Sequence, residues 1–385
     1  MLLKSLKKKK EKHTWRDNKM SLIVEGSVKI EGTISDGDVN RKMEVFYNPI
    51  MDSNRNISIL LLNCVANKKM RVADILAGSG IRSLRFLKEL KKGKIEEVCV
   101  NDLKPNFENT FLDNLRLNKL SDKMVKIFNQ DATIFLFNSQ GFDYIEVDPF
   151  GSPNPFLSAA IAKISREGIL AITATDTAAL TGTYPRVTQR KYWAKSMRNY
   201  LMHEIGLRIL IRKVQLQGVQ FDKALVPILS YHKEHYFRIY FKCIKGKEKC
   251  DQLLREHQYF LFCNKCLNFK TSCFNESKCA CGAEFEYAGP LWIGKLFNAK
   301  LIAKMAKENK FIEEQKFLDI LKEESTRDLV GFYDLHVLAK KFKQDPQKKE
   351  VLANLGAVST HFSPTGFKTE KEIKEIVSML SKKKE

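Results

Sequence analysis

Between residues 71 and 174 the chain alternates short apolar runs with segments of helical periodicity, and this alternation most restricts its possible folds. The predicted strands are 72–76, 97–101, 124–128, 142–147 and 168–174. The predicted helices between them are 81–90, 106–117, 133–137 and 155–164. Strands that alternate with helices pair in parallel through right-handed crossovers. The sequence therefore predicts a parallel sheet with helices on both faces.

Segments on either side extend this prediction. Residues 21–32 alternate like a short strand pair with glycine turns, and the following loop opens a helix for which Asn56 and Ser58 offer capping side chains. The predicted elements after residue 180 are a helix over 186–203, a helix from residue 204, and an antiparallel strand pair, 223–231 and 236–242. A mostly parallel sheet closed by an antiparallel hairpin is typical of the Rossmann-like α/β fold of class I methyltransferases.

The end of the first predicted strand carries a glycine loop. Ligands of open parallel sheets bind outside the carboxyl ends of the strands. Here DILAGSGIRSLRF places Gly78 and Gly80 directly after the strand, where glycine lets a ligand approach the backbone. Ser83 stands where a dinucleotide fingerprint has its third glycine. The loop is compatible with a dinucleotide, with S-adenosylmethionine, or with a tight turn alone.

Acidic residues end the next two predicted strands. Asp102 lies about 20 residues beyond Gly80, the spacing at which a carboxylate accepts both ribose hydroxyls of a nucleotide cofactor. Asp131 could accept the adenine amine, with the Ala132 amide against the ring. Each aspartate could instead cap the helix that follows it.

The fourth strand ends in Asp148-Pro149-Phe150, the most informative of these sites. An exocyclic amine on a base is a poor nucleophile because its lone pair is delocalised into the ring. A carboxylate that accepts its N–H helps to localise the lone pair and can take the proton. Pro149 stiffens the turn, and Phe150 can stack on the base. The alternative is a rigid turn with a capping aspartate.

The cysteines gather in one short segment. The chain has nine cysteines, an odd number, which together with the lack of a signal peptide favours a reducing compartment. Within CNKCLNFKTSCFNESKCACG, Cys263 and Cys266 form a CxxC pair, and Cys279 and Cys281 a CxC pair. Four thiolates suit a structural zinc without a catalytic position. Cys273 is a possible substitute ligand, and a disulfide or free thiols are the alternatives.

The net charge of +21 on 385 residues implies a polyanionic partner, nucleic acid before an anionic membrane surface. No apolar run is long enough to span a bilayer. Cations and aromatic side chains are interleaved between residues 184 and 213, a composition that suits phosphates and unstacked bases. They are Tyr184, Arg186, Arg190, Lys191, Tyr192, Trp193, Lys195, Arg198, Tyr200, Arg208, Arg212 and Lys213.

Several strings resemble the tRNA (guanine-26-N2)-dimethyltransferases of the archaeal and eukaryotic type, over about residues 24–368. They are FYNPIMDSNR (46–55), AGSGIRSLRF (77–86), DPFGSPNPF (148–156), ITATDTAALTGTYPR (172–186), HYFRIYFK (235–242), AGPLW (288–292), GFYDLH (331–336) and THFSPTGFKT (360–369). DPFGSP and THFSPTG together are highly specific. Many members of that family carry Asp where this chain has Glu146 and Asn56.

The resemblance implies S-adenosylmethionine as the methyl donor and two successive transfers to N2 of guanine-26 in tRNA. It implies that Asp148 and Phe150 are catalytic and that residues 173–176 lie beside the target base. The implied donor-binding residues are Arg55, Gly78, Gly80, Arg82, Asp102, Asp131 and Ala132.

The predicted organisation is a basic arm over 1–20, a methyltransferase domain over 21–245, and a smaller α+β tRNA-binding domain over 246–385 with a zinc knuckle at 263–281. We expect a cytoplasmic monomer that binds tRNA and no membrane. One alternative is a methyltransferase for an exocyclic amine of another RNA base. The other is a non-catalytic RNA-binding protein with this fold, although that protein would not need an acid at three successive strand ends.

Overall fold

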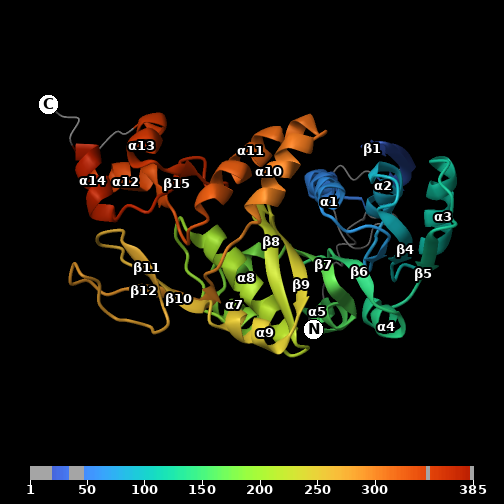
Figure 1. Ribbon diagram of the computed structural model, residues 1–385, viewed down its shortest axis with the longest axis horizontal. Coiled ribbons are helices and arrows are strands. Elements are labelled where there is room, and N and C mark those ends of the chain that lie inside the picture. Colours follow the sequence, from blue (N-terminus) through green and yellow to red (C-terminus); the bar gives the residue numbers. More distant parts are fainter. Residues whose placement is uncertain (1–19, 34–46, 344–346, 382–385) are drawn as a thin grey trace, which may run out of the picture.

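The computed structural model describes residues 20–33, 47–343 and 347–381. The predicted basic arm lies outside the described residues except for Met20. Figure 1 shows the central sheet with its helices at one end of the molecule and the C-terminal helices and small sheets at the other.

A seven-stranded sheet forms the centre of the fold, in the order β5-β4-β3-β6-β7-β9-β8. The first five strands in this order pair in parallel, and β9 pairs antiparallel with both β7 and β8. The strands are β3 (Met70–Asp74), β4 (Ile95–Asn101), β5 (Val125–Phe128), β6 (Phe142–Val147), β7 (Ile164–Ala174), β8 (Lys223–Lys233) and β9 (Tyr236–Lys245). The inner strands are buried almost continuously, which requires cover on both faces. The predicted fold class is confirmed.

The helices of this region are α2 (Ile81–Glu89), α3 (Phe107–Leu117), α4 (Ala132–Asn138), α5 (Asn154–Lys163), α6 (Thr177–Leu180), α7 (Pro185–Tyr192) and α8 (Met202–Val219). The prediction of one helix over 186–203 is wrong. α7 ends at Tyr192, and its C-cap, Trp193, has a left-handed backbone with φ 56°. The following residues leave the helical path and pair with a distant strand, where Lys195 and Gly289 exchange two backbone hydrogen bonds.

The N-terminal elements are the predicted hairpin β1 (Met20–Glu25) and β2 (Val28–Thr33), the 3₁₀ helix η1 (Pro49–Met51) and α1 (Asp52–Cys64). Asn56 and Ser58 do not cap α1 as predicted. They are buried in the helix interior, because the turn starts earlier, where the Asn48 side chain accepts a hydrogen bond from the Ile50 amide at 3.0 Å.

The C-terminal region is smaller and of α+β type, as expected. Its helices are α9 (Lys247–Leu254), α10 (Ala299–Glu308), η2 (Ile312–Glu314), α11 (Gln315–Glu324), η3 (Ser325–Arg327), α12 (Leu335–Phe342), α13 (Lys348–Leu355) and α14 (Ile373–Ser381). Its two sheets comprise β10 (His257–Phe262), β11 (Phe269–Ser272) and β12 (Glu286–Trp292), and β13 (Tyr333–Asp334), β14 (Val358–Ser359) and β15 (Gly366–Lys368).

A buried set of charges, here called the junction network, joins α8 to this C-terminal region. Its members are Glu204, Arg208, Glu324, His361 and Lys368. The ammonium of Lys368 lies 3.2 Å from a carboxylate oxygen of Glu204 and 3.2 Å from one of Glu324. Elsewhere α10 packs on α1, and Lys304 donates to the carbonyl of Cys64 at 2.8 Å. None of the helices in the described ranges has the length and apolar character needed to cross a membrane.

Candidate active site and cysteine cluster

A cavity of about 530 Å³ lies at the carboxyl ends of the parallel strands, where the fold places ligands. Most of the predicted site residues line it, together with Tyr47 and Asp74, which the sequence did not single out as ligand-binding. The predicted residues that line it are Arg55, Gly78, Arg82, Asp102, Asp148 and Phe150.

The glycine loop follows β3 in the way the sequence predicted. Gly78 has φ 61°, and its amide donates to the Asp102 carboxylate at 2.8 Å. Gly80 does not line the cavity, but it has φ 74°, and a Cβ there would lie 2.2 Å from the ring of Phe111. Gly80 is therefore required for the packing of α2 against α3, and Gly78 for the wall of the cavity.

Asp131 and Ala132 lie in the turn from β5 into α4, outside the residues that line the cavity. The Asp131 carboxylate accepts hydrogen bonds from the amides of Thr133 and Ile134 at 2.8 and 3.1 Å, so it caps α4. The helix-cap alternative is therefore present in the structure, and adenine contact remains a prediction.

Asp148 is held by an ion pair. Arg82 donates to its carboxylate at 2.6 Å and also to Asn54 and Ser58, each at 3.0 Å. Although burial opposes the charge on Arg82, the carboxylates of Glu146 and Asp148 raise the pKa of its guanidinium. The side chain of Asp148 is 19% exposed and faces the cavity. The ion pair thus fixes the position of the predicted catalytic carboxylate.

Beneath this pair lies a second one, fully buried. Two guanidinium nitrogens of Arg238 bind the two carboxylate oxygens of Glu146, and the same guanidinium donates to Thr173 and Ser58 at 2.8 and 3.0 Å. Burial would raise the pKa of Glu146, but the charges of Arg238 and Arg82 outweigh it and lower that pKa. We call Arg82, Glu146, Asp148 and Arg238 the active-site network.

Arg55 reaches the cavity from α1. It makes a two-point ion pair with Glu25 of β1 and donates to the Asn48 carbonyl at 3.0 Å. Burial alone would raise the pKa of Glu25, but Arg55 and Arg85 hold it below its usual value. The N-terminal hairpin therefore fixes the arginine that was predicted to contact the methyl donor.

Asp74 is a buried acid in the wall of the cavity that sequence reasoning did not assign. It ends β3, and the Ser83 hydroxyl donates to it at 2.8 Å. Burial raises the pKa of Asp74 to about 7. Its place as the last strand residue before the glycine loop was the signal that could have identified it.

The loops around Asp148 are tied to α7. The hydroxyl of Tyr192 donates to Asp176 at 2.6 Å and lies 3.0 Å from the Ser152 hydroxyl. Asn154 donates to the carbonyl of Lys191 at 2.8 Å. The segment after DPF and the end of the 173–176 loop are therefore held by the same helix, and Thr175 of that loop lines the cavity.

The basic and aromatic segment over residues 184–213 is only partly exposed to solvent. Fewer of its side chains can therefore contact an RNA than the sequence suggested. Arg208 and Lys213 are buried, and Arg208 is paired with Glu204. Tyr192 is buried as well. The exposed members are Tyr184, Arg186, Arg190, Lys191, Trp193, Lys195 and Arg198.

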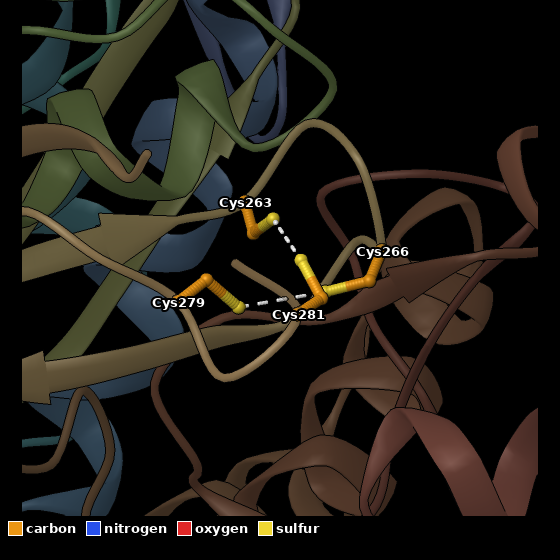
Figure 2. A group of neighbouring side chains, drawn as sticks. All are labelled: Cys263, Cys266, Cys279 and Cys281. Atoms are coloured by element: carbon orange, nitrogen blue, oxygen red, sulfur yellow. Dashed lines mark hydrogen bonds between the residues drawn. The ribbon is translucent and has the colours of Figure 1, made fainter. Parts of the chain in front are cut away.

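The predicted metal ligands converge (Figure 2). The sulfur atoms of Cys263, Cys266, Cys279 and Cys281 all lie within 4.8 Å of one another, with separations of 3.5 and 3.6 Å for two pairs. Zn–S bonds of about 2.3 Å in a tetrahedron require sulfur separations of about 3.8 Å. The donor set therefore fits zinc. Cys273 is exposed and is not part of this cluster.

Comparison with known proteins agrees with this geometry. The family model described as N2,N2-dimethylguanosine tRNA methyltransferase matches residues 21–381. The chain belongs to this family. Among its relatives, the tRNA (guanine(26)-N(2)/guanine(27)-N(2))-dimethyltransferase of Aquifex aeolicus is 37% identical, over 94% of this chain and 96% of the relative. The tRNA (guanine(26)-N(2))-dimethyltransferase of Methanobrevibacter smithii is 38% identical, over 94% and 98%.

A solved structure of the same family supports the fold over almost the whole chain. Trm1 from Pyrococcus horikoshii, in complex with S-adenosyl-L-methionine, superposes with a TM-score of 0.83 at 32% identity and covers 94% of this chain and 100% of that one. The predicted membership of the tRNA guanine-N2 dimethyltransferase family is thereby confirmed.

Proposed function

We propose that this protein transfers one and then a second methyl group from S-adenosylmethionine to N2 of guanine-26 in tRNA. Membership of the dimethyltransferase family supports this. The observation that carries the proposal is the Asp148 carboxylate, fixed by Arg82 at the edge of the cavity.

When bound, S-adenosylmethionine supplies an electrophilic methyl group on a good leaving group, so catalysis by the protein is mainly positioning. Arg82 binds Oδ2 of Asp148. Among the described residues, none forms a hydrogen bond to Oδ1, which is therefore free to accept an N–H of the guanine amine. Phe150 is 38% exposed and supplies a ring on which the guanine can stack. One N–H remains after the first transfer, so the same acceptor serves the second.

The residues that would hold the methyl donor surround the glycine loop. We assign the ribose hydroxyls to Asp102, and the amino-acid end to Arg55 and Arg82. The Asp102→Ala variant should raise the dissociation constant of the donor, measured by calorimetry, and leave tRNA affinity unchanged. An unchanged donor affinity would remove Asp102 from the site.

The cysteine cluster would hold a structural zinc. Its four thiolates leave no position for a substrate, so it supports the C-terminal region rather than the reaction. Elemental analysis of intact protein should give about one zinc per chain, and less than about half an equivalent would count against the site.

We further propose residues 21–245 as the catalytic domain and residues 246–385 as the tRNA-binding domain. We also propose a cytoplasmic monomer, which light scattering and cell fractionation would test.

The deciding experiment incubates unmodified tRNA with the protein and the donor, followed by mass spectrometry of nucleosides and mapping of the modified position. Dimethylguanosine at position 26 is expected, and a tRNA with adenine-26 serves as the control. Methylation of another nucleoside alone would overturn the proposal. The name of the Aquifex relative includes guanine-27, so the same mapping tests a second methylated position.

A further inference from the structure

Trp193 combines solvent exposure with a restricted backbone. Its side chain is 48% exposed, and its backbone is left-handed, with φ 56° and ψ 36°. A bulky residue adopts this conformation only where its surroundings determine it, and such positions cluster at functional sites. Trp193 is the C-cap of α7, so its left-handed backbone ends the helix and leaves an exposed aromatic ring at that end.

The surroundings of Trp193 hold its backbone from several sides. Its amide donates to the Gln189 carbonyl at 3.1 Å, and its own carbonyl accepts from Arg212 at 3.2 Å. Two residues later, Lys195 and Gly289 exchange backbone hydrogen bonds of 2.9 and 2.7 Å. These contacts fix the backbone from which the indole projects.

One cation lies against this ring, and others stand close to Trp193 in the sequence. The ammonium of Lys213 lies 2.9 Å from the indole centroid, and that of Lys195 lies 3.8 Å from the ring centroid of Tyr287. Lys191 and Arg198, on either side in sequence, are exposed. A flat aromatic surface among cations is the combination that binds unpaired nucleotides, because bases stack on the ring and phosphates bind the charges.

The position of Trp193 connects it to the catalytic loops. The preceding residue, Tyr192, donates to Asp176 and contacts Ser152, and the carbonyl of Lys191 accepts from Asn154. A nucleotide on Trp193 would therefore lie on the element that positions the loops beside Asp148.

We propose that Trp193 is a stacking site for an unpaired base of the tRNA, distinct from the pocket of the target guanine, with Lys191, Lys195 and Arg198 binding the flanking phosphates. This proposal rests on the proposed function for the identity of the RNA. The site recognises one unstacked base and not a duplex, because a base pair within a helix does not offer a free face.

The test compares Trp193→Ala and Trp193→Phe with Ile312→Ala, a control at a side chain that is 90% exposed on η2. Trp193→Ala should raise both the dissociation constant and the KM for tRNA about 10-fold, the usual size of one base–aromatic stack. Trp193→Phe should recover most of this loss. The kcat at saturating tRNA and the donor affinity should not change in any variant.

Equal tRNA affinity in Trp193→Ala and the wild type would overturn the proposal, and so would equal losses in the Ala and Phe variants. A fall in kcat with unchanged affinity would also overturn it, because Trp193 would then act by supporting the loop that contains Asp176.

In a second measurement, tRNA should quench the tryptophan fluorescence of the wild type much more than that of Trp193→Phe, whereas a blunt RNA duplex should not. Tight tRNA binding that depends on Trp193 without methylation of guanine-26 would refute the proposed function and leave this inference standing.

Discussion

The active-site network and the junction network are both clusters of buried charges, but only one of them opens onto the cavity. In the first, Arg238 and Glu146 are fully buried and Arg82 carries the chain of charges to Asp148. In the second, every charged side chain is enclosed, and Glu324 binds Lys368 and His361. Burying charges is costly and gives little net stability over apolar packing. The two networks therefore need different explanations.

The difference between the two networks shows that the sequence motifs shared with the family have different roles. DPFGSPNPF contributes Asp148 to a network that ends at the cavity, whereas THFSPTGFKT contributes His361 and Lys368 to one that docks α8 against α11. Both strings contribute to the resemblance to the family. Only the first is placed to do chemistry, and the second specifies how the two parts of the chain fit together.

The largest effect is expected at the open end of the active-site network. Asp148→Asn removes the acceptor while keeping the side-chain size, so kcat should fall about 10³-fold, measured by methyl incorporation into tRNA. Donor affinity and melting temperature serve as controls and should change little. Activity near that of the wild type would mean that the carboxylate is not the acceptor.

One step further from the cavity, a smaller loss of activity is expected. Glu146→Gln leaves Arg238 without a buried counter-charge and loosens Arg82, so kcat should fall about 10-fold and stability by about 3 kcal/mol. Glu146→Asp keeps the charge and should recover part of both. Rates measured well below the unfolding temperature separate the two effects, and a stability loss with unchanged kcat would make this network purely structural.

In the junction network the expected effect is on stability alone. Glu324→Gln should lower the free energy of unfolding by about 3 kcal/mol, since it removes the charged partner of His361 and one of the two carboxylate partners of Lys368. The kcat of the folded fraction should equal that of the wild type. Urea unfolding and tRNA methylation measure the two quantities, and a matching loss of kcat would erase the distinction between the networks.

The stability of the junction network should also fall at low pH, through the carboxylate of Glu324. Burial opposes ionisation of Glu324, but His361 and Lys368 more than compensate and lower its pKa from 4.5 to about 2. A carboxyl group whose pKa is lowered by folding stabilises the fold at pH values above its pKa in the unfolded chain. This contribution is lost as the pH falls from about 4.5 towards 2. Wild-type stability should fall over this range more steeply than that of Glu324→Gln, as followed by circular dichroism.

The smallest effect is expected at an exposed ion pair that joins the two parts of the chain elsewhere. Lys91 lies 2.7 Å from Glu308 of α10, and both side chains are accessible to water. Exposed pairs contribute little because water and salt screen them. Lys91→Ala should change neither kcat nor the melting temperature beyond about 1 °C, and a large shift would show that enclosure is not what separates the networks.

The sheet and most of the site could be predicted from sequence because their signals are local. Strand periodicity and the residues at the strand ends give the order of elements and four residues of the cavity wall, to which the family resemblance adds Arg55 and Arg82. The break at Trp193 could not be predicted, because its cause is the pairing of Lys195 with Gly289, about a hundred residues away. The burial of Asn56 is similar, since its partner Glu313 comes from η2.

The partners of the charged residues were also beyond sequence reasoning. The resemblance assigned Arg82 to the donor, and it gave no indication that Arg82 also pairs with Asp148. The choice of Cys279 and Cys281 over Cys273 depends on how the loop after β11 folds back, which spacing alone does not determine. Such contacts require the three-dimensional arrangement of segments that are distant in sequence.

The two backbone hydrogen bonds between Lys195 and Gly289 bear on attempts to make a minimal enzyme. Removing everything after residue 245 would leave the amide and carbonyl of Lys195 unsatisfied next to α7, the helix that holds the loops beside Asp148. It would also uncover the surface of α1 against which α10 packs. The two parts of the chain are thus poor candidates for exchange between homologues as separate cassettes, and a chimera would have to carry residues 184–198 together with β12.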